Sequence, residues 1–256
     1  IVGEVWEERV LLTSYFQRNS KNSDGYEGNL PSITDFPLKS AINTAFNEQD
    51  GWEQGLTRIY YVLIQDFAYT EPNNNVIFLD NHDITRFATS VGGDINKQKM
   101  GFATLLTMRG IPQMFYGGEI GMPGDGGNHG TLRADMPGGW KGDNRSVFTE
   151  AGRTKDENDL FHYISTILTW RKSKPVIHNG KLMHFIPENG IYVYFRYTDT
   201  ESVMVILNNN AEEKTLTTER FTERLKGFNS AENIVTKQTV SNLQSIALPA
   251  KSATIL

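Results

Sequence analysis

Apolar and polar positions along this chain follow two different patterns, and the change falls near Gly180. Before that point, short apolar runs alternate with longer segments in which apolar residues recur every third or fourth position. The short runs predict strands and the longer segments predict amphipathic helices, and their alternation favours a parallel sheet. The expected strands are 1–2, 31–36, 76–79 and 111–116, and the expected helices are 38–46, 55–69, 97–108 and 156–172.

One of these expected helices, at 55–69, allows a specific statement about the core. Its apolar residues recur at helical spacing and therefore share one face. We expect that face to be buried, and it consists of Leu56, Ile59, Tyr60, Leu63, Ile64 and Phe67.

Beyond Gly180 the chain consists of short apolar runs separated by turns rich in Asn, Gly, Glu and Thr. This spacing predicts an antiparallel β-sandwich. We therefore expect two domains, residues 1–176 and residues 177–256. The expected strands of the second domain are 191–195, 203–207, 233–235, 245–248 and 253–256.

Composition narrows the classes of function. The chain has 256 residues, of which 38% are hydrophobic, enough for a large core, and no run approaches the ~18 apolar residues that a membrane span needs. A net charge of −5 without a Lys/Arg cluster argues against nucleic acid as a partner. The absence of cysteine excludes disulfides and thiolate chemistry. Because the chain opens on an apolar strand at Ile1 without an initiator Met, we expect a fragment cut at or inside a strand.

Two of the expected strands end in residues that can carry chemistry. The run 76–79 is followed by His82 and Asp83, and the run 1–2 is followed by Glu4. Ligands of parallel sheets and barrels bind at the carboxyl ends of the strands, which is where these side chains would project. The alternative is that the acidic residues after 76–79 only cap the next helix.

Acidic residues on neighbouring strand ends suit glycoside hydrolysis, in which two carboxyl groups ~5 Å apart serve a retaining mechanism. A metal site at His82 and Asp83 is the rival interpretation. No second cluster of His or Asp supplies further ligands, so we expect no metal site. His129, which lies among glycines, has no expected partner and is assigned to a loop.

The same residues resemble a known family. GEVW at 3–6 and FLDNHD at 78–83 resemble the third and fourth signature regions of the α-amylase superfamily. The segment GIPQMFYGGEIGM at 110–122 and the ending LPAKSATIL at 248–256 are similar to the same family. The DFPL at 35–38 is most similar to the neopullulanase/cyclomaltodextrinase group. The resemblance implies an α/β fold, the second half of a (β/α)₈ TIM barrel (strands five to eight) followed by an antiparallel β-sandwich domain.

The resemblance also implies roles for individual residues. Glu4 would be the general acid/base, Asp83 the carboxylate that binds sugar hydroxyls and strengthens that contact in the transition state, and His82 a hydrogen-bond donor to the same sugar. The substrate would be an α-glucan such as a maltooligosaccharide, pullulan or a cyclodextrin. Pyranose rings stack on aromatic faces, so Trp6, Tyr26 and Trp140 are candidate platforms, with ordinary core positions as the alternative.

One element of the family pattern is absent. The family's nucleophile is an Asp in an R-x-D motif that precedes the acid/base, and only three residues precede Glu4. Arg133-Ala134-Asp135 has the R-x-D spacing but follows the last expected barrel strand and a glycine run, so we reject Asp135 as nucleophile. We expect Arg133, Met136 and Trp140 to shape the substrate cleft instead. A further departure is Gly118, where the family usually has Asp.

These features set the expected partners. The chain alone would lack the nucleophile and be inactive, so its partners would be the α-glucan and the missing N-terminal half of the barrel. The open strand edges make a homodimer possible. No cofactor is expected in this segment, although calcium elsewhere in the full-length protein is compatible with the family, and the compartment would be periplasmic or cytoplasmic in a bacterium. A glycan-binding or inactive homologue and a transglycosylase on the same scaffold are the alternative functions.

Overall fold

The computed structural model describes residues 1–256, and its first part is built on parallel strands in chain order. β1 pairs with β2, a bridge between Thr34 and Val76 continues the sheet, and β3 pairs with β4, all in the parallel sense. Each strand therefore neighbours the next strand in the sequence, as in a barrel segment. The bounds are β1 (Val2–Gly3), β2 (Ser32–Ile33), β3 (Val76–Phe78) and β4 (Ile111–Gln113).

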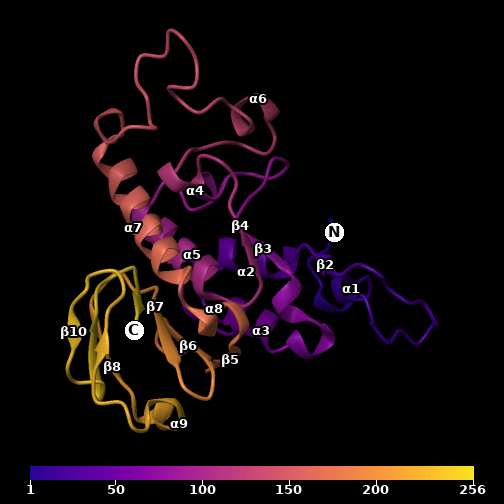
Figure 1. Ribbon diagram of the computed structural model, residues 1–256, viewed down its shortest axis with the longest axis vertical. Coiled ribbons are helices and arrows are strands. Elements are labelled where there is room, and N and C mark those ends of the chain that lie inside the picture. The colour runs from indigo at the N-terminus through magenta and orange to yellow at the C-terminus, as the bar shows by residue number, and fades with distance from the viewer.

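Helices connect these strands and cover one side of them (Figure 1). The longer ones are α2 (Phe36–Ala45), α3 (Thr57–Leu63), α5 (Ile95–Thr107) and α7 (Lys155–Arg171). Short helices are α1 (Val10–Ser14), α4 (Phe87–Ser90), α6 (His129–Leu132) and α8 (Pro175–Asn179), and 3₁₀ turns lie at Asp66–Ala68, Pro72–Asn74, Gly118–Ile120 and Glu150–Gly152. The strand, helix, strand order expected from the sequence is confirmed for this part.

Side-chain caps fix the start of three of the longer helices. Asp35 accepts a backbone N–H of the first turn of α2 at 3.0 Å, and Asp94 accepts two such groups of α5 at 2.9 and 3.1 Å. Thr154 and Glu157 form a reciprocal capping box at the start of α7. These caps satisfy N–H groups that the helices cannot pair internally, which is why the helices start where they do.

The second part of the chain is an antiparallel β-sandwich, seen in orange and yellow in Figure 1. One layer is a four-stranded sheet in the order β12-β7-β6-β5, and the other contains the pairs β11-β8 and β10-β9. The bounds are β5 (Lys181–His184), β6 (Ile191–Tyr197), β7 (Ser202–Asn208), β8 (Lys214–Thr217), β9 (Ala231–Glu232), β10 (Thr239–Val240), β11 (Ser245–Leu248) and β12 (Ser252–Ile255), with a 3₁₀ turn at Glu219–Phe221 and α9 (Thr222–Leu225) between β8 and β9.

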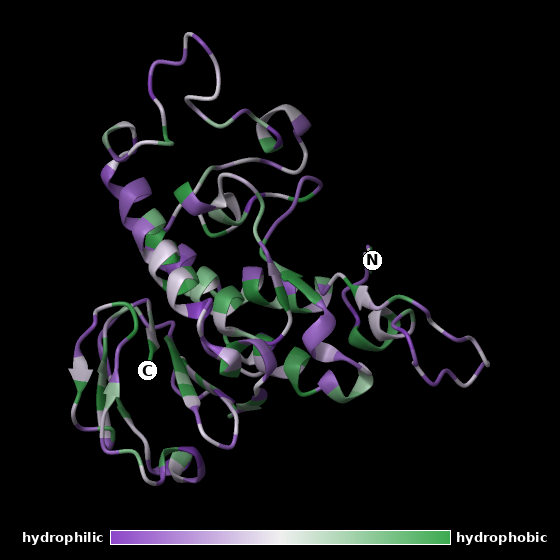
Figure 2. Cartoon of the chain, in the orientation of Figure 1, coloured by the Kyte–Doolittle hydropathy of each residue, from purple (hydrophilic) through white to green (hydrophobic).

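The two parts share one hydrophobic core. Side chains alternate between the faces of β6, and both faces are buried. Tyr192 and Tyr194 belong to a cluster of 30 buried residues that also contains residues of α2, α5 and α7. Val193 and Phe195 belong to a separate cluster of 10 inside the sandwich. Figure 2 shows apolar residues along β6 and β7, which lie between the helices and the second layer of the sandwich.

The expected core face of residues 55–69 is only partly correct. Leu56, Ile59 and Leu63 are buried, whereas Ile64 is 41% and Phe67 83% exposed, and Tyr60 is half-buried. The reason is that α3 ends at Leu63 and a 3₁₀ turn follows, so the helical spacing no longer places Phe67 on the buried face.

The strand expected at 233–235 is wrong. Residues 234–236 form a turn, because Asn233 Oδ1 accepts the backbone N–H groups of Val235 and Thr236 at 3.0 and 3.1 Å. Such side-chain acceptors favour a turn over a strand. The strand in this region is β9, two residues earlier, and the expectation also missed β5, β8 and β10.

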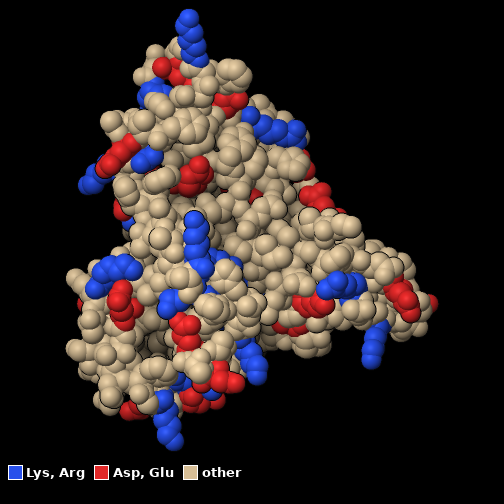
Figure 3. Space-filling model, viewed as in Figure 1, with Lys and Arg blue, Asp and Glu red and all other residues tan.

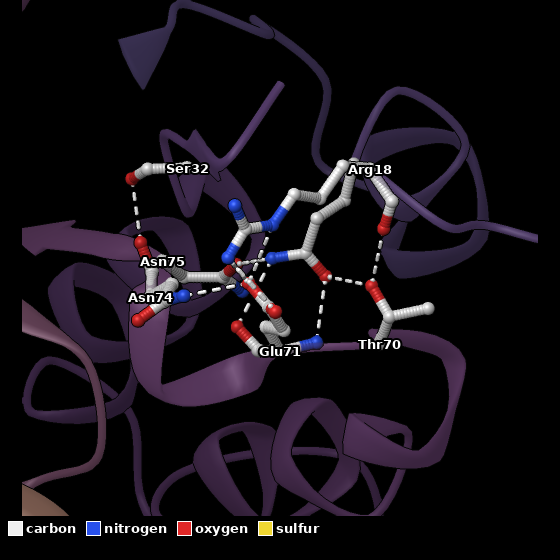
Figure 4. Close-up of polar contacts among 7 residues, drawn as sticks. Arg18, Ser32, Thr70, Glu71, Asn74 and Asn75 are labelled. Carbon is white, nitrogen blue, oxygen red and sulfur yellow. Dashed lines mark hydrogen bonds and ion pairs between the residues drawn. The ribbon is translucent and has the colours of Figure 1, made fainter. Parts of the chain in front are cut away.

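A buried amide network fastens the amino ends of the strands (Figure 4). Gln17, fully buried, donates to Glu71 O and Asn75 Oδ1 at 3.0 Å each, and its Oε1 accepts from Glu71 N at 3.0 Å and Thr70 Oγ1 at 3.1 Å. Arg18 forms a bidentate pair with the Glu71 carboxylate. The network ties the segment after β1 to the turn that leads into β3.

A second buried polar group is centred on Arg109, which lies two residues before β4. The guanidinium of Arg109, 2% exposed, contacts Asp35 at 2.6 Å and Asp66 at 2.5 Å. Burial opposes its charge, but the attraction of Asp35 and then Asp66 outweighs burial and raises the pKa of Arg109. The cluster joins the end of β2, the turn after α3 and the start of β4.

The outer edges of the parallel strands carry exposed apolar side chains. Ile1 is 97%, Val2 49% and Ile111 49% exposed. β1 is paired only with β2, and β4 only with β3. Both strands therefore present unpaired backbone groups beside apolar side chains.

No helix of the structure is long and apolar enough to cross a membrane.

Candidate active site

An aromatic row joins the carboxyl ends of the first three strands. The ring of Trp6 stacks on Phe36 with centroids 5.1 Å and planes 16° apart, and Phe36 meets Phe78 edge-on at 5.0 Å. Trp6 follows β1, Phe36 follows β2 and Phe78 ends β3. Phe36 and Phe78 are buried, whereas Trp6 is 56% exposed. Packing of these rings holds the three strand ends together and leaves one indole surface open to a ligand.

Glu4 lies directly after β1, at the start of this row. The backbone beyond it is fixed because Val5 N donates to Thr34 Oγ1 at 2.9 Å. The Glu4 side chain is exposed, so an acid at this position is accessible from solvent. The order β1-β2-β3 places one strand between Glu4 and Asp83, so close approach of their carboxyl groups stays a prediction.

Asp83, His82 and Arg133 are in direct contact at the end of β3. The Arg133 guanidinium donates to Asp83 Oδ1 at 2.7 Å and to the backbone oxygen of His82 at 2.9 Å. His82 Nε2 lies 3.1 Å from Asp83 Oδ2. All three side chains are partly exposed, so the cluster faces solvent with both carboxylate oxygens engaged. The structure thus brings together three of the residues predicted from the sequence, one of them 50 positions away from its partner.

The turn that carries His82 and Asp83 is held by two hydrogen-bond acceptors that precede it in the sequence. Asp80 Oδ2 accepts the N–H of Phe87, the first residue of α4, at 2.7 Å, and Asn81 Oδ1 accepts the N–H of Asp83 at 2.9 Å. Burial raises the pKa of Asp80 to about 6, against the bond from Phe87 and the positive charge of Arg86. Helix capping, the alternative interpretation of this stretch, is therefore correct for Asp80.

Sequence reasoning overlooked Lys39 as a neighbour of this region. It lies in α2 and is half-buried, and burial lowers its pKa against the attraction of Glu8 and Asp80. A cation thus lies near carboxylates contributed by the segments after β1 and β3. The run Phe36-Pro37-Leu38-Lys39 contains no signal for this, because the neighbours are distant in the sequence.

The remaining candidates occupy separate loops. Tyr26 is 44% exposed and stacks on Tyr15 with centroids 4.8 Å apart, in the loop after α1 that extends to one side in Figure 1. Trp140 is 67% exposed, in the loop that projects beyond α6. Neither ring is part of the core. The side chain of Asp135 is exposed after α6 and does not lie at the end of a strand.

No group of three or more His, Cys, Asp or Glu side chains is arranged to hold a metal ion. His129, assigned to a loop from the sequence, begins α6 instead. Its helix starts there because Asn128 Oδ1 accepts the N–H groups of Gly130 and Thr131 at 3.1 and 3.4 Å.

Comparison with known families accounts for both parts of the chain. Residues 1–180 match the family model described as alpha amylase, catalytic domain. Residues 182–256 match the family model described as cyclo-malto-dextrinase C-terminal domain. The matches meet near Gly180, where the hydrophobic pattern changes.

Curated relatives are enzymes of similar description. Alpha-amylase 3 of Dictyoglomus thermophilum is 28% identical over 236 residues, which cover 84% of this chain and 44% of the relative. A cyclomaltodextrin glucanotransferase of Niallia circulans is 28% identical over 88% of this chain and 30% of the relative. A cyclomaltodextrinase of a Bacillus species is 26% identical over 84% of this chain and 34% of the relative. The chain thus spans less than half the length of these relatives.

Solved structures show the same fold. An alpha-amylase from Geobacillus thermoleovorans, complexed with acarbose, superposes with a TM-score of 0.72 at 22% identity and covers 99% of this chain and 52% of that chain. An alpha-amylase from H. orenii gives a TM-score of 0.69 at 24% identity, with 99% and 52% covered. The arrangement of parallel strands, helices and terminal sandwich is therefore shared with about half of each of these molecules.

Proposed function

The chain belongs to the α-amylase family of glycoside hydrolases, and on this basis we propose that it is part of a retaining α-glucan hydrolase of the neopullulanase, α-amylase or cyclomaltodextrinase type. The substrates would be starch-derived oligosaccharides, pullulan or cyclodextrins. Support for this substrate class comes from relatives named as alpha-amylase and cyclomaltodextrinase. The parallel strands would be strands five to eight of a (β/α)₈ barrel, and the domains would be residues 1–176 and 177–256.

The observation that carries the proposal is the cluster of Asp83, His82 and Arg133 at the end of β3, two strands away from an exposed Glu4. A carboxylate already engaged by Arg133 and His82 is held in one orientation. Such a carboxylate can accept hydrogen bonds from sugar hydroxyls, which are neutral donors. The Arg133 guanidinium still balances the charge of the carboxylate while it does so. Trp6, two residues after Glu4, offers an exposed apolar surface of the kind that the C–H face of a pyranose requires.

In the proposed mechanism Glu4 acts twice. It first protonates the glycosidic oxygen of the leaving sugar and then removes a proton from the water that attacks the glycosyl intermediate. Asp83 accepts hydrogen bonds from the hydroxyls of the sugar that undergoes cleavage, and these bonds strengthen as positive charge develops on the ring. His82 donates to the same sugar, and Arg133 and Trp140 bound the cleft.

A retaining reaction also needs a carboxylate that attacks the anomeric carbon from the face opposite the acid. The one R-x-D sequence in the chain, Arg133-Ala134-Asp135, follows α6 and lies in a loop rather than at the end of a barrel strand. Arg133 in that sequence is engaged with Asp83. We therefore propose that the nucleophile is supplied from outside these 256 residues, and that residues 1–256 alone do not turn over substrate.

Replacement of Glu4 tests the proposal. In an active protein that contains this chain, Glu4→Gln should lower kcat on maltotriose or pullulan by about 10²-fold or more, because the acid acts chiefly in the transition state. The Kd for maltooligosaccharides should change little. Steady-state kinetics and calorimetric titration give the two quantities.

Glu8→Gln is the matched control, because it makes the same chemical change four positions away at a residue whose carboxylate accepts from Ser40 Oγ. Its kcat should stay within a few-fold of the unsubstituted enzyme. Wild-type turnover by Glu4→Gln would show that another residue is the acid. Hydrolysis by purified residues 1–256 would show that the nucleophile lies within them.

A further inference from the structure

Arg86 is a buried cation that follows the Asp83 turn in the chain. Charged side chains of both signs are scattered over the face of the protein seen in Figure 3, where water solvates them. Arg86 is 0% exposed, and its guanidinium donates to backbone oxygens instead of a carboxylate. Removal of a guanidinium from water costs free energy unless its donors find partners. The partners of Arg86 therefore indicate what the residue holds in place.

The guanidinium of Arg86 bonds to two segments that follow β4. Its Nε donates to the backbone oxygen of Leu132 at 2.9 Å, and its Nη1 donates to that of Tyr116 at 2.5 Å. It also lies over the rings of Phe115 and Tyr116, 4.4 and 4.7 Å from their centres. Lysine cannot reproduce a planar fork that stacks on rings and donates in two directions. Arg86 thus joins the segment after β4 to the end of α6.

The backbone on each side of Arg133 is held by this arrangement. The oxygen of Leu132, directly before it, accepts from Arg86. The oxygen of Ala134, directly after it, accepts from the Tyr116 hydroxyl at 2.9 Å. Because Arg86 also contacts the oxygen and the ring of Tyr116, both bonds depend on one guanidinium. The residue between the two held oxygens is the cation that orients the carboxylate of the candidate site.

The loop between β4 and α6 is also attached to residues that follow Asp83. The oxygen of Gly124 accepts the N–H of Arg86 at 3.0 Å, and the N–H of Gly124 donates to Thr89 Oγ1 at 2.9 Å. A Cβ atom at position 124 would come within 2.9 Å of Leu132 Cα and 3.0 Å of Arg86 Cδ. Glycine at this position therefore allows the loop to pack directly on Arg86.

Stability alone does not account for a guanidinium at this position. Arg86 Nη2 is buried and has no hydrogen-bond partner within the chain, which carries a desolvation cost. An apolar side chain of similar volume would fill the same space without that cost. An apolar side chain would not, however, hold the backbone oxygens of Leu132 and Tyr116.

We propose that Arg86 and Tyr116 are positioning residues of the glycoside hydrolase reaction, which act by holding Arg133 against Asp83; this inference rests on the proposed function of that ion pair. Arg86 is fully buried, so it acts through Arg133 and not by contact with a substrate. With both bonds intact, the Asp83 carboxylate keeps one orientation toward the sugar hydroxyls. Without them Arg133 moves away, and fewer molecules hold the carboxylate in the geometry that the transition state needs.

The test is a double-mutant cycle in an active protein that contains this chain. Tyr116→Phe removes one hydroxyl from a partly exposed residue and keeps the ring that Arg86 contacts, so its result does not depend on whether Arg86→Met folds well. Tyr116→Phe should lower kcat/KM for maltotriose about fivefold, and Arg86→Met about twentyfold or more. In an Arg133→Met background each change should lower it less than about twofold, because the residue through which it acts is absent.

Hydrogen exchange gives a second readout that does not need catalysis. The amides of Leu132, Arg133 and Ala134 donate to backbone oxygens of α6 and of the residue before it. Mass spectrometry of a peptide that spans residues 129–136 should show these amides exchanging about tenfold faster in Arg86→Met than in the unsubstituted chain.

Arg196→Met is the matched control, because Arg196 is equally buried and donates to two backbone oxygens, those of Ile177 and Gly180, at 3.1 and 2.7 Å. It removes the same buried group from another part of the fold. It should leave both kcat/KM and exchange at residues 132–134 unchanged.

Equal losses of kcat/KM with and without Arg133 would overturn the inference, as would unchanged exchange at residues 132–134 in Arg86→Met. Faster exchange in Arg86→Met, in a protein whose turnover does not depend on Arg133, would support the hold on Arg133 and count against the proposed function. The two failures are therefore distinguishable.

Discussion

At the scale of single residues, the position of Asp83 depends on the residue that precedes its turn. Asp80 is 6% exposed and accepts the N–H of Phe87, so its carboxylate joins the end of β3 to the start of α4. Arg86, Lys39 and the Phe87 N–H face this carboxylate and favour its ionised form, but burial outweighs them. A buried carboxyl with a raised pKa binds a proton more readily in the folded than in the unfolded chain.

This difference sets a pH dependence. Between pH 4 and pH 6 the folded state holds more protons at Asp80 than the unfolded state does, so the free energy of unfolding contributed by this group falls as pH rises. A pKa raised from 3.8 to about 6 corresponds to roughly 3 kcal/mol. Asp80→Asn retains an acceptor for Phe87 and cannot ionise. Urea unfolding from pH 4 to pH 7.5 should show the variant gaining stability relative to the unsubstituted chain as pH rises, and a difference that is constant with pH would contradict this account.

Gln17 is the second single residue whose hydrogen bonds stabilise segments distant from it in the sequence. Both ends of its amide are bonded while the residue is fully buried. Gln17→Leu would leave the N–H of Glu71 and the Oδ1 of Asn75 without these partners, at a cost of about 1–3 kcal/mol for each group. We expect the free energy of unfolding to fall by about 3 kcal/mol. The control Gln238→Leu changes an exposed side chain and should stay within ~0.5 kcal/mol of the parent, and an equal effect of the two changes would contradict the role of the network.

At the scale of elements, the sequence predicts those helices and strands that are specified by residues close together in the chain. α5 and α7 differ from their expected bounds by at most two residues at either end, because long apolar stripes and side-chain caps at Asp94 and Thr154 are both visible in the sequence. The β3 run and the His82-Asp83 turn after it are visible for the same reason. β5 and β8 were missed because four-residue strands with polar neighbours carry too few alternations to be recognised.

Contacts between distant residues account for the remaining differences. The helical spacing of residues 55–69 continues past Leu63, but Asp66 is drawn into the ion pair with Arg109, 43 positions away, and the turn it forms exposes Phe67. The contact of Arg133 with Asp83 spans 50 positions. A pattern of residue types does not contain these distances, so the sequence predicted a role for Arg133 near the cleft without its partner.

The exposed edge of β4 leads to a prediction about self-association. Unpaired parallel strands with apolar side chains pair readily with other strands, and lysine at an edge opposes this. We expect residues 1–256 at tens of micromolar to be dimeric or larger by light scattering. Ile111→Lys should shift the distribution toward monomer, whereas Ile64→Lys, at a similarly exposed position at the end of α3, should not. A monomeric parent chain would contradict this prediction.

At the scale of the whole molecule, the two parts of the chain share one hydrophobic core. We therefore expect them to unfold together as one cooperative unit. The large cluster contains residues of α5 and α7 together with Tyr194 and Leu207, and Thr107 Oγ1 lies 2.6 Å from the Tyr194 hydroxyl. Asn209 also donates to the backbone oxygen of Ala45 at 3.2 Å. Neither part can unfold without exposing apolar surface on the other.

Calorimetry should therefore show one transition for residues 1–256. Leu207→Ala, at a fully buried position of the shared cluster, should lower the midpoint of that single transition through a loss of about 2–5 kcal/mol. Leu216→Ala, at a half-buried position in β8, should lower it less. Two transitions, of which only one responds to Leu207→Ala, would show that the sandwich domain unfolds on its own.

The buried cluster of Arg109, Asp35 and Asp66 has a consequence for how this sequence can evolve. Loss of Arg109 leaves two carboxylates without their counter-charge, and loss of Asp35 or Asp66 breaks one ion pair and leaves the guanidinium with a single partner. Breaking such a buried pair costs about 3–5 kcal/mol, although an apolar trio of similar volume would be tolerated. Each single step away from the cluster is thus harmful even where the final combination is not. Among descendants of this gene, the codons of all three residues should be retained together. Where one of them has been replaced, the other two should have been replaced in the same lineage.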